Sequence, residues 1–302
     1  MAVVAILGPG GVGAFLAAAL AHAGERVVVV AREPTARRLA THGIEVDSAR
    51  LGRFSARPAV TEVLQERASV LFLATKATTL GSALERIETE PELAVPLLNG
   101  LEHMQTLRDR FGAERVAAGV IRIESDSPQV GWVTQTSPFL RVDLAADDPR
   151  VRPLLAPVAA MLEGARIPVL LDDSEAHLLW SKLVRLIALA CTTSASDRTI
   201  GFIRSDARWR ATLMACIEEA AAVADAEGAK VDPASVVAEL EAAHSSLGSS
   251  MQRDIAAGRV PELDAIAGAV LRAGARHGIE CATIRRLSVE IAERAGIPPP
   301  RI

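Results

Sequence analysis

The chain has 302 residues, half of them hydrophobic, and a nearly balanced formal net charge of −4. This length allows one large domain or two ordinary ones, and the mixed charges lack the basic patches that bind nucleic acid or an anionic membrane. Neither partner is predicted. Three scattered cysteines, an N-terminus without signal-peptide features and apolar runs too short for a membrane span favour a cytoplasmic protein without disulfides or a metal site.

The first half of the sequence alternates short apolar runs with helical patterns. Fully apolar strands separated by helices predict a parallel sheet covered on both faces, which is a doubly wound α/β architecture. Around residues 131–144 the composition favours strands without helices, so we expect antiparallel additions at one edge of this sheet. The predicted strands are Val3–Leu7, Val27–Val30, Ser69–Ala74, Ala94–Leu98 and Val116–Ile121, with helices such as Val12–Ala23 and Thr79–Glu88 between them.

The second half is helical, because apolar residues recur there at spacings of three and four. We place the domain boundary between Asp172 and Asp173, where a strand over Ile167–Leu171 ends. An α/β domain over 1–172 and an all-helical domain over 173–302 follow from this boundary, with a proline-rich irregular tail. The predicted helices are Ser174–Ala190, Asp206–Glu227, Pro233–Ser246 and Pro261–His277.

The first strand runs directly into a glycine pattern that begins a helix of small residues. Gly8 would make the tight turn, Gly10 would let the backbone approach a diphosphate, and Gly13 would let the helix pack closely on the strand. Free amides at the start of the helix favour an anion there. This context predicts a dinucleotide site in a Rossmann-type domain rather than a chance glycine-rich turn. The site consists of Gly8, Pro9, Gly10, Gly11, Val12 and Gly13.

The residues after the second strand bear on the choice of cofactor. Arg32 follows this strand, where an enzyme that uses NAD usually carries a carboxylate for the ribose hydroxyl. An arginine suits a 2′-phosphate, which it can hold with two charged hydrogen bonds, so NADPH is favoured. Two alternatives stay open: Arg32 is a solvated surface residue, or the neighbouring Glu33 binds an NAD ribose.

Two further polar residues follow predicted strands at the edge where ligands bind in open α/β sheets. Lys76 comes after the third strand and would support the adenosine phosphate. Asn99 comes after the fourth strand and would form a hydrogen bond with the ribose or the carboxamide near the nicotinamide. Either residue could equally belong to an ordinary loop.

A helix that Ser174 or Asp173 can cap carries Lys182 on a stripe of leucines. An ammonium group on an apolar stripe is costly unless it is paired, and the ordinary alternative is a lysine that extends toward solvent. Later in the chain, Glu262 lies at the start of a predicted helix, where the helix dipole favours a negative charge. The ordinary alternative to a functional role is that Glu262 only stabilises this start of the helix. Ser250, a few residues earlier, could be a helix cap.

Together these segments resemble the ketopantoate reductase (2-dehydropantoate 2-reductase) family over nearly the whole chain. The order and separation of six motifs carry this resemblance. They are GPGGVG, the strand-end Arg32, TKA around Lys76, LNG around Asn99, LWSKL around Lys182, and SSMQRD followed by GRVPELD.

The resemblance implies a role for each of these side chains. Lys182 would be the general acid, Glu262 its ionic partner beside the nicotinamide ribose, and Asn99 a contact of both cofactor and substrate. Ser250 would bind the substrate carboxylate. Arg32 and Lys76 would hold the 2′-phosphate of NADPH. The implied reaction is reduction of a small 2-oxo acid to a 2-hydroxy acid, in which the lysine protonates the ketone oxygen as hydride arrives, in a cleft between the two domains.

The sequence departs from the family pattern on the lysine helix. Family members usually carry asparagines one and two turns after the lysine, where this chain has Leu186 and Ala190. These positions would line the substrate pocket, so a bulkier or less hydroxylated 2-oxo acid is an alternative to ketopantoate. A related dehydrogenase of the same architecture and an NADPH-binding sensor without activity are also compatible with the sequence. The sequence allows a homodimer.

Overall fold

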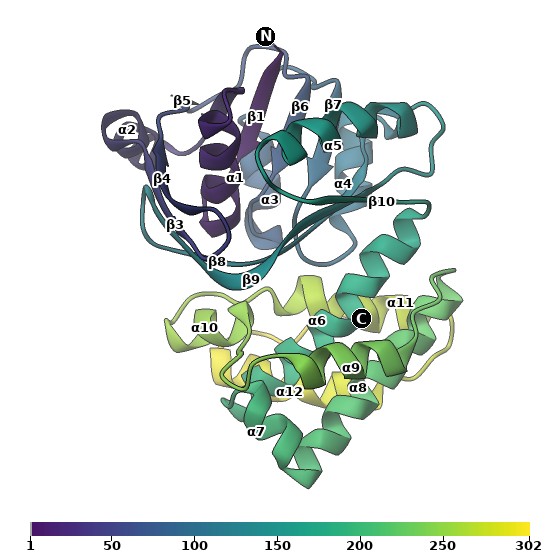
Figure 1. Cartoon of the computed structure of the whole chain (residues 1–302). Coiled ribbons are helices and arrows are strands. Elements are labelled where there is room, and N and C mark those ends of the chain that lie inside the picture. The colour runs from purple at the N-terminus through teal and green to yellow at the C-terminus, as the bar shows by residue number, and fades with distance from the viewer. Residues whose placement is uncertain (1) are drawn as a thin grey trace. The chain divides into compact units, whose positions relative to one another are not determined.

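The computed structural model describes residues 2–302, and the chain divides into two compact units (Figure 1). The first unit comprises Met1–Leu98 and His103–Leu178, and the second comprises Asn99–Glu102 and Leu179–Ile302. The chain therefore changes unit six residues after the boundary expected between 172 and 173. The inclusion of 99–102 in the second unit is not foreseen by the sequence, since these residues follow a strand of the first.

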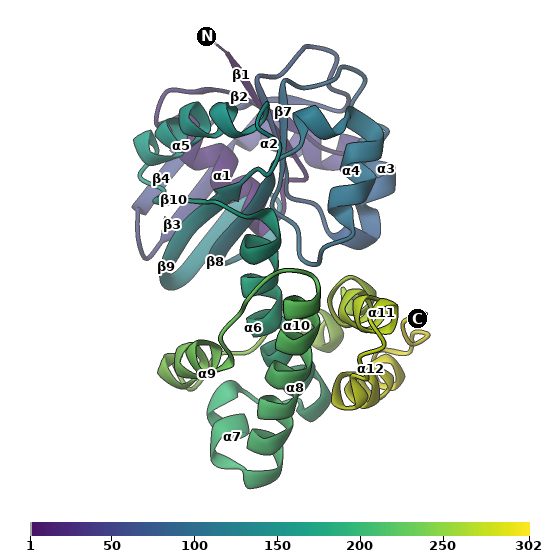
Figure 2. The ribbon, with the colours of Figure 1, turned by 90° about the vertical axis from the view of Figure 1, so that its right-hand side faces the viewer.

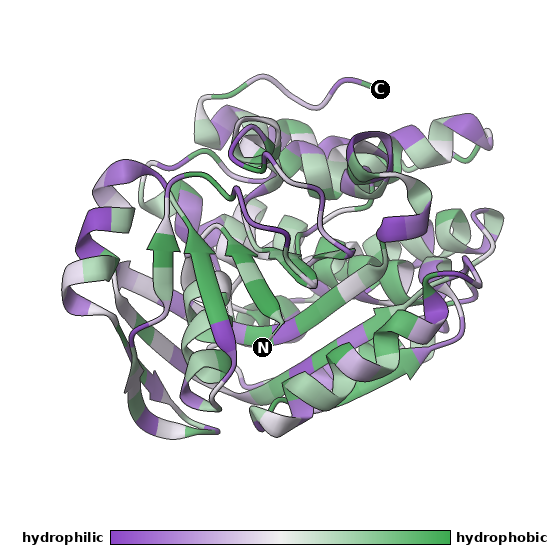
Figure 3. Ribbon diagram, turned by 90° about the horizontal axis from the view of Figure 1, so that it is seen from above, coloured by the Kyte–Doolittle hydropathy of each residue, from purple (hydrophilic) through white to green (hydrophobic). Residues whose placement is uncertain are grey.

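The first unit is built on a parallel five-stranded sheet with the order β5-β2-β1-β6-β7. The central strands are buried along nearly their whole length, and Figure 3 shows hydrophobic residues along them. Full burial on both faces explains why these strands read as continuous apolar runs. The predicted parallel sheet is confirmed, with β1 (Val3–Leu7), β2 (Arg26–Val30), β5 (Ala59–Thr61), β6 (Val70–Leu73) and β7 (Leu93–Pro96). Strand β5 is not among the expected strands, and the strand expected over Val116–Ile121 lies in another sheet, in an antiparallel pair.

A second sheet lies in the same unit, with the order β10-β9-β3-β4 and β8 paired antiparallel to β9. The expected antiparallel pairing is therefore present, but in a separate sheet, which adjoins the edge strand β7 through a bridge between Ala94 and Val116. Strand β9 is also parallel to β3 and to β10 over different parts of its length. The strands are β3 (Ile44–Ser48), β4 (Gly52–Ala56), β8 (Ala118–Gln129), β9 (Trp132–Ala145) and β10 (Val169–Asp172).

Helix α1 (Gly11–His22) contacts both sheets and is buried on nearly all sides. Its run of alanines allows this, because small side chains let two sheets approach one helix, and a helix that is apolar all round is a buried one. Figure 2 shows α3 and α4 on the face of the parallel sheet away from α1. The other helices of this unit are α2 (Glu33–His42), α3 (Leu80–Leu84), α4 (His103–Phe111) and α5 (Leu155–Gly164).

The second unit is helical, as predicted, and most of it follows α6 (Glu175–Ser196), which the Ser174 hydroxyl caps by accepting from the amide of His177. Helix α6 is long and apolar enough to cross a membrane, but 67% of its most apolar window is buried, as in the core helix of a folded protein. The remaining helices are α7 (Ile200–Ser205), α8 (Ala207–Ala226), α9 (Pro233–Ala242), α10 (Ser250–Ala256), α11 (Ala269–Arg276) and α12 (Ala282–Ala295).

The helix expected over Pro261–His277 begins later and less regularly than the sequence indicates. Helical structure starts at Leu263, and Asp264–Gly268 forms a π-helical turn that leads into α11. The amide of Ala269 donates to the carbonyl of Asp264, five residues earlier, which is the bond that defines a π-turn. Glu262 therefore precedes a widened helical turn rather than lying within a regular first turn.

All three cysteines are buried. Burial raises the pKa of the Cys191 thiol to about 12 and that of Cys281 to about 11. Both thiols are therefore protonated at neutral pH, and neither is suited to act as a nucleophile.

Candidate active site

The glycine turn joins β1 to α1 in a conformation that only glycine accepts easily. Gly8 has a φ of +91°, and the amide of Gly10 donates to the Gly8 carbonyl at 2.9 Å. A Cβ on Gly13 would lie only 2.2 Å from the Gly8 carbonyl oxygen. The helix thus packs against the turn at the distance that the predicted role of Gly13 requires.

The side of the turn at Gly10, the N-cap of α1, faces open space. Apart from its two chain neighbours, a Cβ on Gly10 would come within 4 Å of no atom of the described residues. The first turn of α1 carries no acidic residue, so its free amides and the positive end of the helix dipole can accept an anion. The residues present therefore fit a dinucleotide diphosphate.

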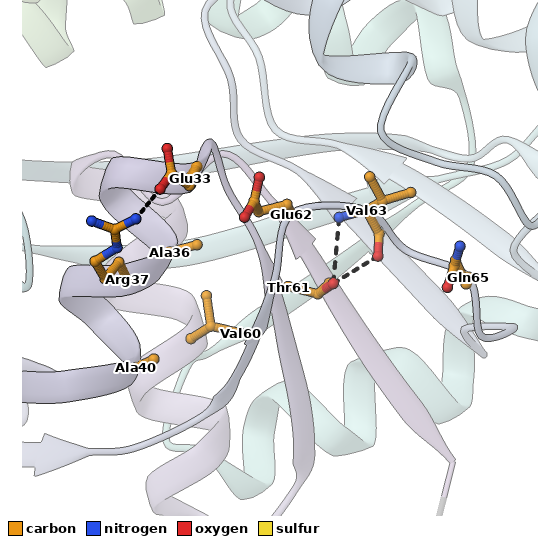
Figure 4. Close-up of a pocket in the computed structure, with 9 residues that line it drawn as sticks. All are labelled: Glu33, Ala36, Arg37, Ala40, Val60, Thr61, Glu62, Val63 and Gln65. Carbon is orange, nitrogen blue, oxygen red and sulfur yellow. Dashed lines mark hydrogen bonds and ion pairs between the residues drawn. The ribbon is translucent and has the colours of Figure 1, made fainter.

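Arg32 follows β2 and is the N-cap of α2. Its side chain is exposed and forms no hydrogen bond or ion pair with any residue that the structure describes. Glu33, in contrast, forms an ion pair with Arg37 one turn further along α2 (Figure 4). The carboxylate that could have served an NAD ribose is thus engaged, and Arg32 is available for a 2′-phosphate.

An open hollow of about 490 Å³ lies beside this part of α2 (Figure 4). It is lined by α2, by the end of β5 and by the residues that follow β5, and no residue of the glycine turn lines it. The glycine turn, rather than this hollow, therefore defines the candidate cofactor site.

Lys76 comes three residues after β6 and is the half-buried N-cap of a short 3₁₀-helix over Ala77–Thr79. Strands β2 and β6 flank β1 and run parallel to it. The three strands therefore end at the same edge of the sheet, and the residues that come after them there include Arg32, Gly8 and Lys76. Ligands bind at this edge in this class of fold.

In the helical unit, Asn99 and Glu262 meet although they are 163 residues apart in the chain. The amide nitrogen of Asn99 donates to a carboxylate oxygen of Glu262 at 3.0 Å, and Glu262 is only 7% exposed. The next residue, Gly100, has a φ of +90°, and a Cβ there would lie 2.3 Å from the carbonyl oxygen of Ala265. The loop after β7 is thus packed directly on the π-helical turn.

Three predicted substrate-pocket residues share one face of α6, because they are spaced by four. Lys182 and Leu186 are half-buried, and Ala190 is completely buried. Neither Leu186 nor Ala190 has a side-chain group that can form a hydrogen bond, as the sequence indicates.

Ser249, and not Ser250, is the cap of α10. Its hydroxyl accepts from the amide of Gln252 at 3.0 Å and from the hydroxyl of Thr193 at 2.9 Å. Ser250 is the first residue of the helix and is exposed. Thr193 lies three residues after Ala190, so this buried bond ties the start of α10 to α6. The sequence does not predict this role of Thr193. The only indication in the sequence is its position on α6, three residues after Ala190.

A glycine turn between a parallel strand and a buried helix, followed by a helical unit that carries a lysine and a buried glutamate, defines a class of nicotinamide-dependent oxidoreductase. Models of the ketopantoate reductase PanE/ApbA family match residues 4–145, and models of its C-terminal part match residues 176–295. The chain belongs to the ketopantoate reductase family. It is an NADPH-dependent oxidoreductase that acts on CH-OH groups, so the predicted fold and cofactor are confirmed.

Individual relatives agree with this assignment. The chain is 29% identical to a 2-dehydropantoate 2-reductase of Caulobacter vibrioides, over 92% of this chain and 94% of the relative. It is 26% identical to the uncharacterized oxidoreductase YkpB of Bacillus subtilis, over 90% and 91%.

Two solved structures share the fold. A 2-dehydropantoate 2-reductase of Geobacter metallireducens has a TM-score of 0.90 at 24% identity and covers 96% of this chain and 99% of its own. A D-mandelate dehydrogenase with NADH and anilino(oxo)acetate has a TM-score of 0.89 at 18% identity, with 97% and 98% covered.

The first prediction concerns Gly10. Gly10→Ala should leave the unfolding midpoint unchanged, because the new methyl group meets no protein atom, but should weaken NADPH binding at least about tenfold by occupying the space of the diphosphate. Calorimetric titration and thermal unfolding measure the two effects. Gly81→Ala, which also adds a methyl group in open space but lies on α3, is the control. Equal NADPH affinity in both variants would place the diphosphate elsewhere.

The second prediction concerns Arg32. Arg32→Gln should weaken NADPH binding about tenfold or more and leave NADH binding nearly unchanged, because only NADPH carries the phosphate that the guanidinium would hold. Arg38→Gln, an exposed arginine of the same helix that donates to the Val130 carbonyl, is the matched control. Parallel losses for both cofactors would show that Arg32 does not bind the 2′-phosphate.

Proposed function

We propose that the protein reduces a 2-oxo acid to the corresponding 2-hydroxy acid, as a ketopantoate reductase that converts ketopantoate to pantoate. The hydrogen bond between Asn99 and the buried carboxylate of Glu262 is the observation that most supports this. A buried carboxylate is costly unless it is paired, and such groups concentrate at functional sites. Here the pair consists of two residues for which the family resemblance implies contact with the cofactor.

The proposed chemistry needs a proton at the ketone oxygen as negative charge develops there. NADPH, when bound, supplies the hydride. Lys182 donates the proton from its half-buried position on α6, and it regains one from water after the product leaves. Glu262 keeps the ammonium form favourable in a partly desolvated setting. Asn99 fixes the orientation of that carboxylate, and the exposed hydroxyl of Ser250 binds the substrate carboxylate.

A third prediction tests this role of the lysine. Lys182→Ala should lower kcat with 2-oxo acids by about 10²- to 10⁴-fold, the usual contribution of a general acid, while NADPH affinity changes little. NADPH oxidation followed by absorbance measures the rate. Lys230→Ala removes an exposed lysine of the same unit and should have no effect. Turnover that survives in Lys182→Ala would exclude this side chain as the acid.

A second candidate function differs in the substrate. Leu186, the half-buried one of the two positions, offers only apolar surface to a ligand, and Ala190 is completely buried, whereas ketopantoate carries a hydroxyl group that needs a partner. A 2-oxo acid with a bulky apolar side chain fits such a face better, and a D-mandelate dehydrogenase is among the structures that share this fold. We therefore include branched and aromatic 2-oxo acids beside ketopantoate as candidate substrates.

A fourth prediction distinguishes the two substrates. Leu186→Asn should raise kcat/KM for ketopantoate relative to an aromatic 2-oxo acid by about tenfold or more, because the amide can bind the hydroxyl group. Leu186→Met, which conserves volume and remains apolar, should leave the ratio nearly unchanged. An identical ratio in all three proteins would remove Leu186 from the determinants of specificity. Tight NADPH binding without turnover of any of these acids would favour a sensor protein.

A further inference from the structure

The four-residue segment 99–102 is fastened to the helical unit at three successive points. Asn99 donates to Glu262, and the backbone of Gly100 packs on the carbonyl of Ala265. The third point is Glu102, which forms a two-fold hydrogen bond with the guanidinium of Arg272 on α11. Each point joins the segment to the π-helical turn, its flanking Glu262 or the helix that follows it.

Arg272 holds more than this one glutamate. Its Nε and one terminal nitrogen each donate to Glu102 at 2.7 Å, and the other terminal nitrogen donates to a carboxylate oxygen of Asp264 at 2.8 Å. That second nitrogen also donates to the carbonyl of Arg301 in the C-terminal tail at 2.8 Å. The hydrogen bond with Glu102, followed by that with Asp264, raises the pKa of the Arg272 guanidinium above its ordinary value.

The local backbone is shaped to admit this guanidinium. A Cβ on Gly268, within the π-helical turn, would lie 2.7 Å from a carboxylate oxygen of Asp264 and 2.9 Å from a terminal nitrogen of Arg272. The side chain of Arg272 is only 23% exposed, while those of Glu102 and Asp264 are 51% and 64% exposed. Isolated exposed ion pairs contribute little, but a planar fork that holds two carboxylates and a carbonyl fixes their relative geometry.

We propose that Arg272 is a positioning residue, which holds the segment 99–102 against the π-helical turn and thereby keeps Asn99 on Glu262. Asp264 is two residues from Glu262, and Glu102 is three residues from Asn99. By binding Asp264 and Glu102, the guanidinium of Arg272 therefore fixes the two segments that carry the partners of the Asn99–Glu262 hydrogen bond. Arg272 itself is not a catalytic residue. Its importance for the reaction rests on the proposed function, since Asn99 and Glu262 act there, and a displacement of about 1 Å in such groups can cost two orders of magnitude in rate.

Three variants test the proposal in the full chain: Arg272→Gln, Arg272→Lys and Glu102→Gln. Arg276→Gln is the matched control, because Arg276 lies one turn further along α11 and also pairs with a glutamate, Glu227, at 3.0 Å. Hydrogen exchange of the backbone amides at 99–102 and 262–268 measures the attachment. kcat and KM with NADPH and ketopantoate, or the best substrate of the panel, measure its effect on the reaction.

In Arg272→Gln and Glu102→Gln we expect faster exchange at 99–102 and a kcat lowered about tenfold or more, with the KM for NADPH changed far less. Arg272→Lys, which keeps the charge but not the fork, should fall between these variants and the wild type. The double variant Glu102→Gln/Arg272→Gln should lose no more than the worse single variant, because the two side chains act through one contact.

If the amides at 99–102 exchange hydrogen no faster in Arg272→Gln and Glu102→Gln than in Arg276→Gln, the attachment itself is overturned. Faster exchange with an unchanged kcat, or additive losses in the double variant, would overturn the positioning role. If the wild type reduces no 2-oxo acid, the proposed function fails, and the exchange rates alone then decide whether Arg272 holds the segment.

Discussion

The hydrogen bond from Asn99 to the carboxylate of Glu262 is the interaction on which the rest of the site depends. Burying a carboxylate almost completely is costly unless the group has a hydrogen-bonding partner, and the amide of Asn99 supplies one. The bond also ties together two regions that the chain separates: the loop after the last strand of the parallel sheet and the irregular start of α11. The position of Asn99 therefore depends on how that loop is held, and not on the sheet alone.

Two unusual backbone features make the bond geometrically feasible. Gly100 adopts a positive φ and lies so close to Ala265 that no side chain would fit. The π-helical turn over Asp264–Gly268 widens the start of α11, and such turns occur often at functional sites. A positive φ costs glycine little, but a π-helical turn is rare and less regular than an α-helical one, so this turn depends on the surrounding contacts for its stability. The guanidinium of Arg272, which bonds the loop, the turn and the tail together, supplies the most extensive of these contacts.

The sequence predicts the parallel sheet, the glycine turn and the helix of Lys182, because each depends on a local pattern: apolar runs, glycine spacing or helical periodicity. It misplaces the strands around 131–144, because the pairing of β9 with β3 and β10 is set by contacts remote in the chain. It misses the attachment of 99–102 for the same reason, since nothing local shows that a loop after β7 belongs with the helical unit. The cap of α10 is a smaller case: the sequence suggests Ser250, but Ser249 is the cap. Local sequence does not distinguish two adjacent serines, whereas the hydrogen bond from Thr193, remote in the chain, goes to Ser249.

The hydrogen-bonded set around the proposed carboxylate Glu262 lies on other elements of the helical unit than the residues that would select the substrate. The proposed acid Lys182, in contrast, shares α6 with the latter residues. Asn99, Glu262 and Arg272 form one hydrogen-bonded set around the π-helical turn. Leu186, Ala190 and Thr193 lie on α6, and Thr193 joins this face to α10 through Ser249. The hydrogen bonds of the first set are made without Leu186, whose side chain has no hydrogen-bonding group. Under the proposed function, the same acid and carboxylate would serve different 2-oxo acids, and Leu186 would bear on the choice of substrate rather than on the ability to transfer hydride.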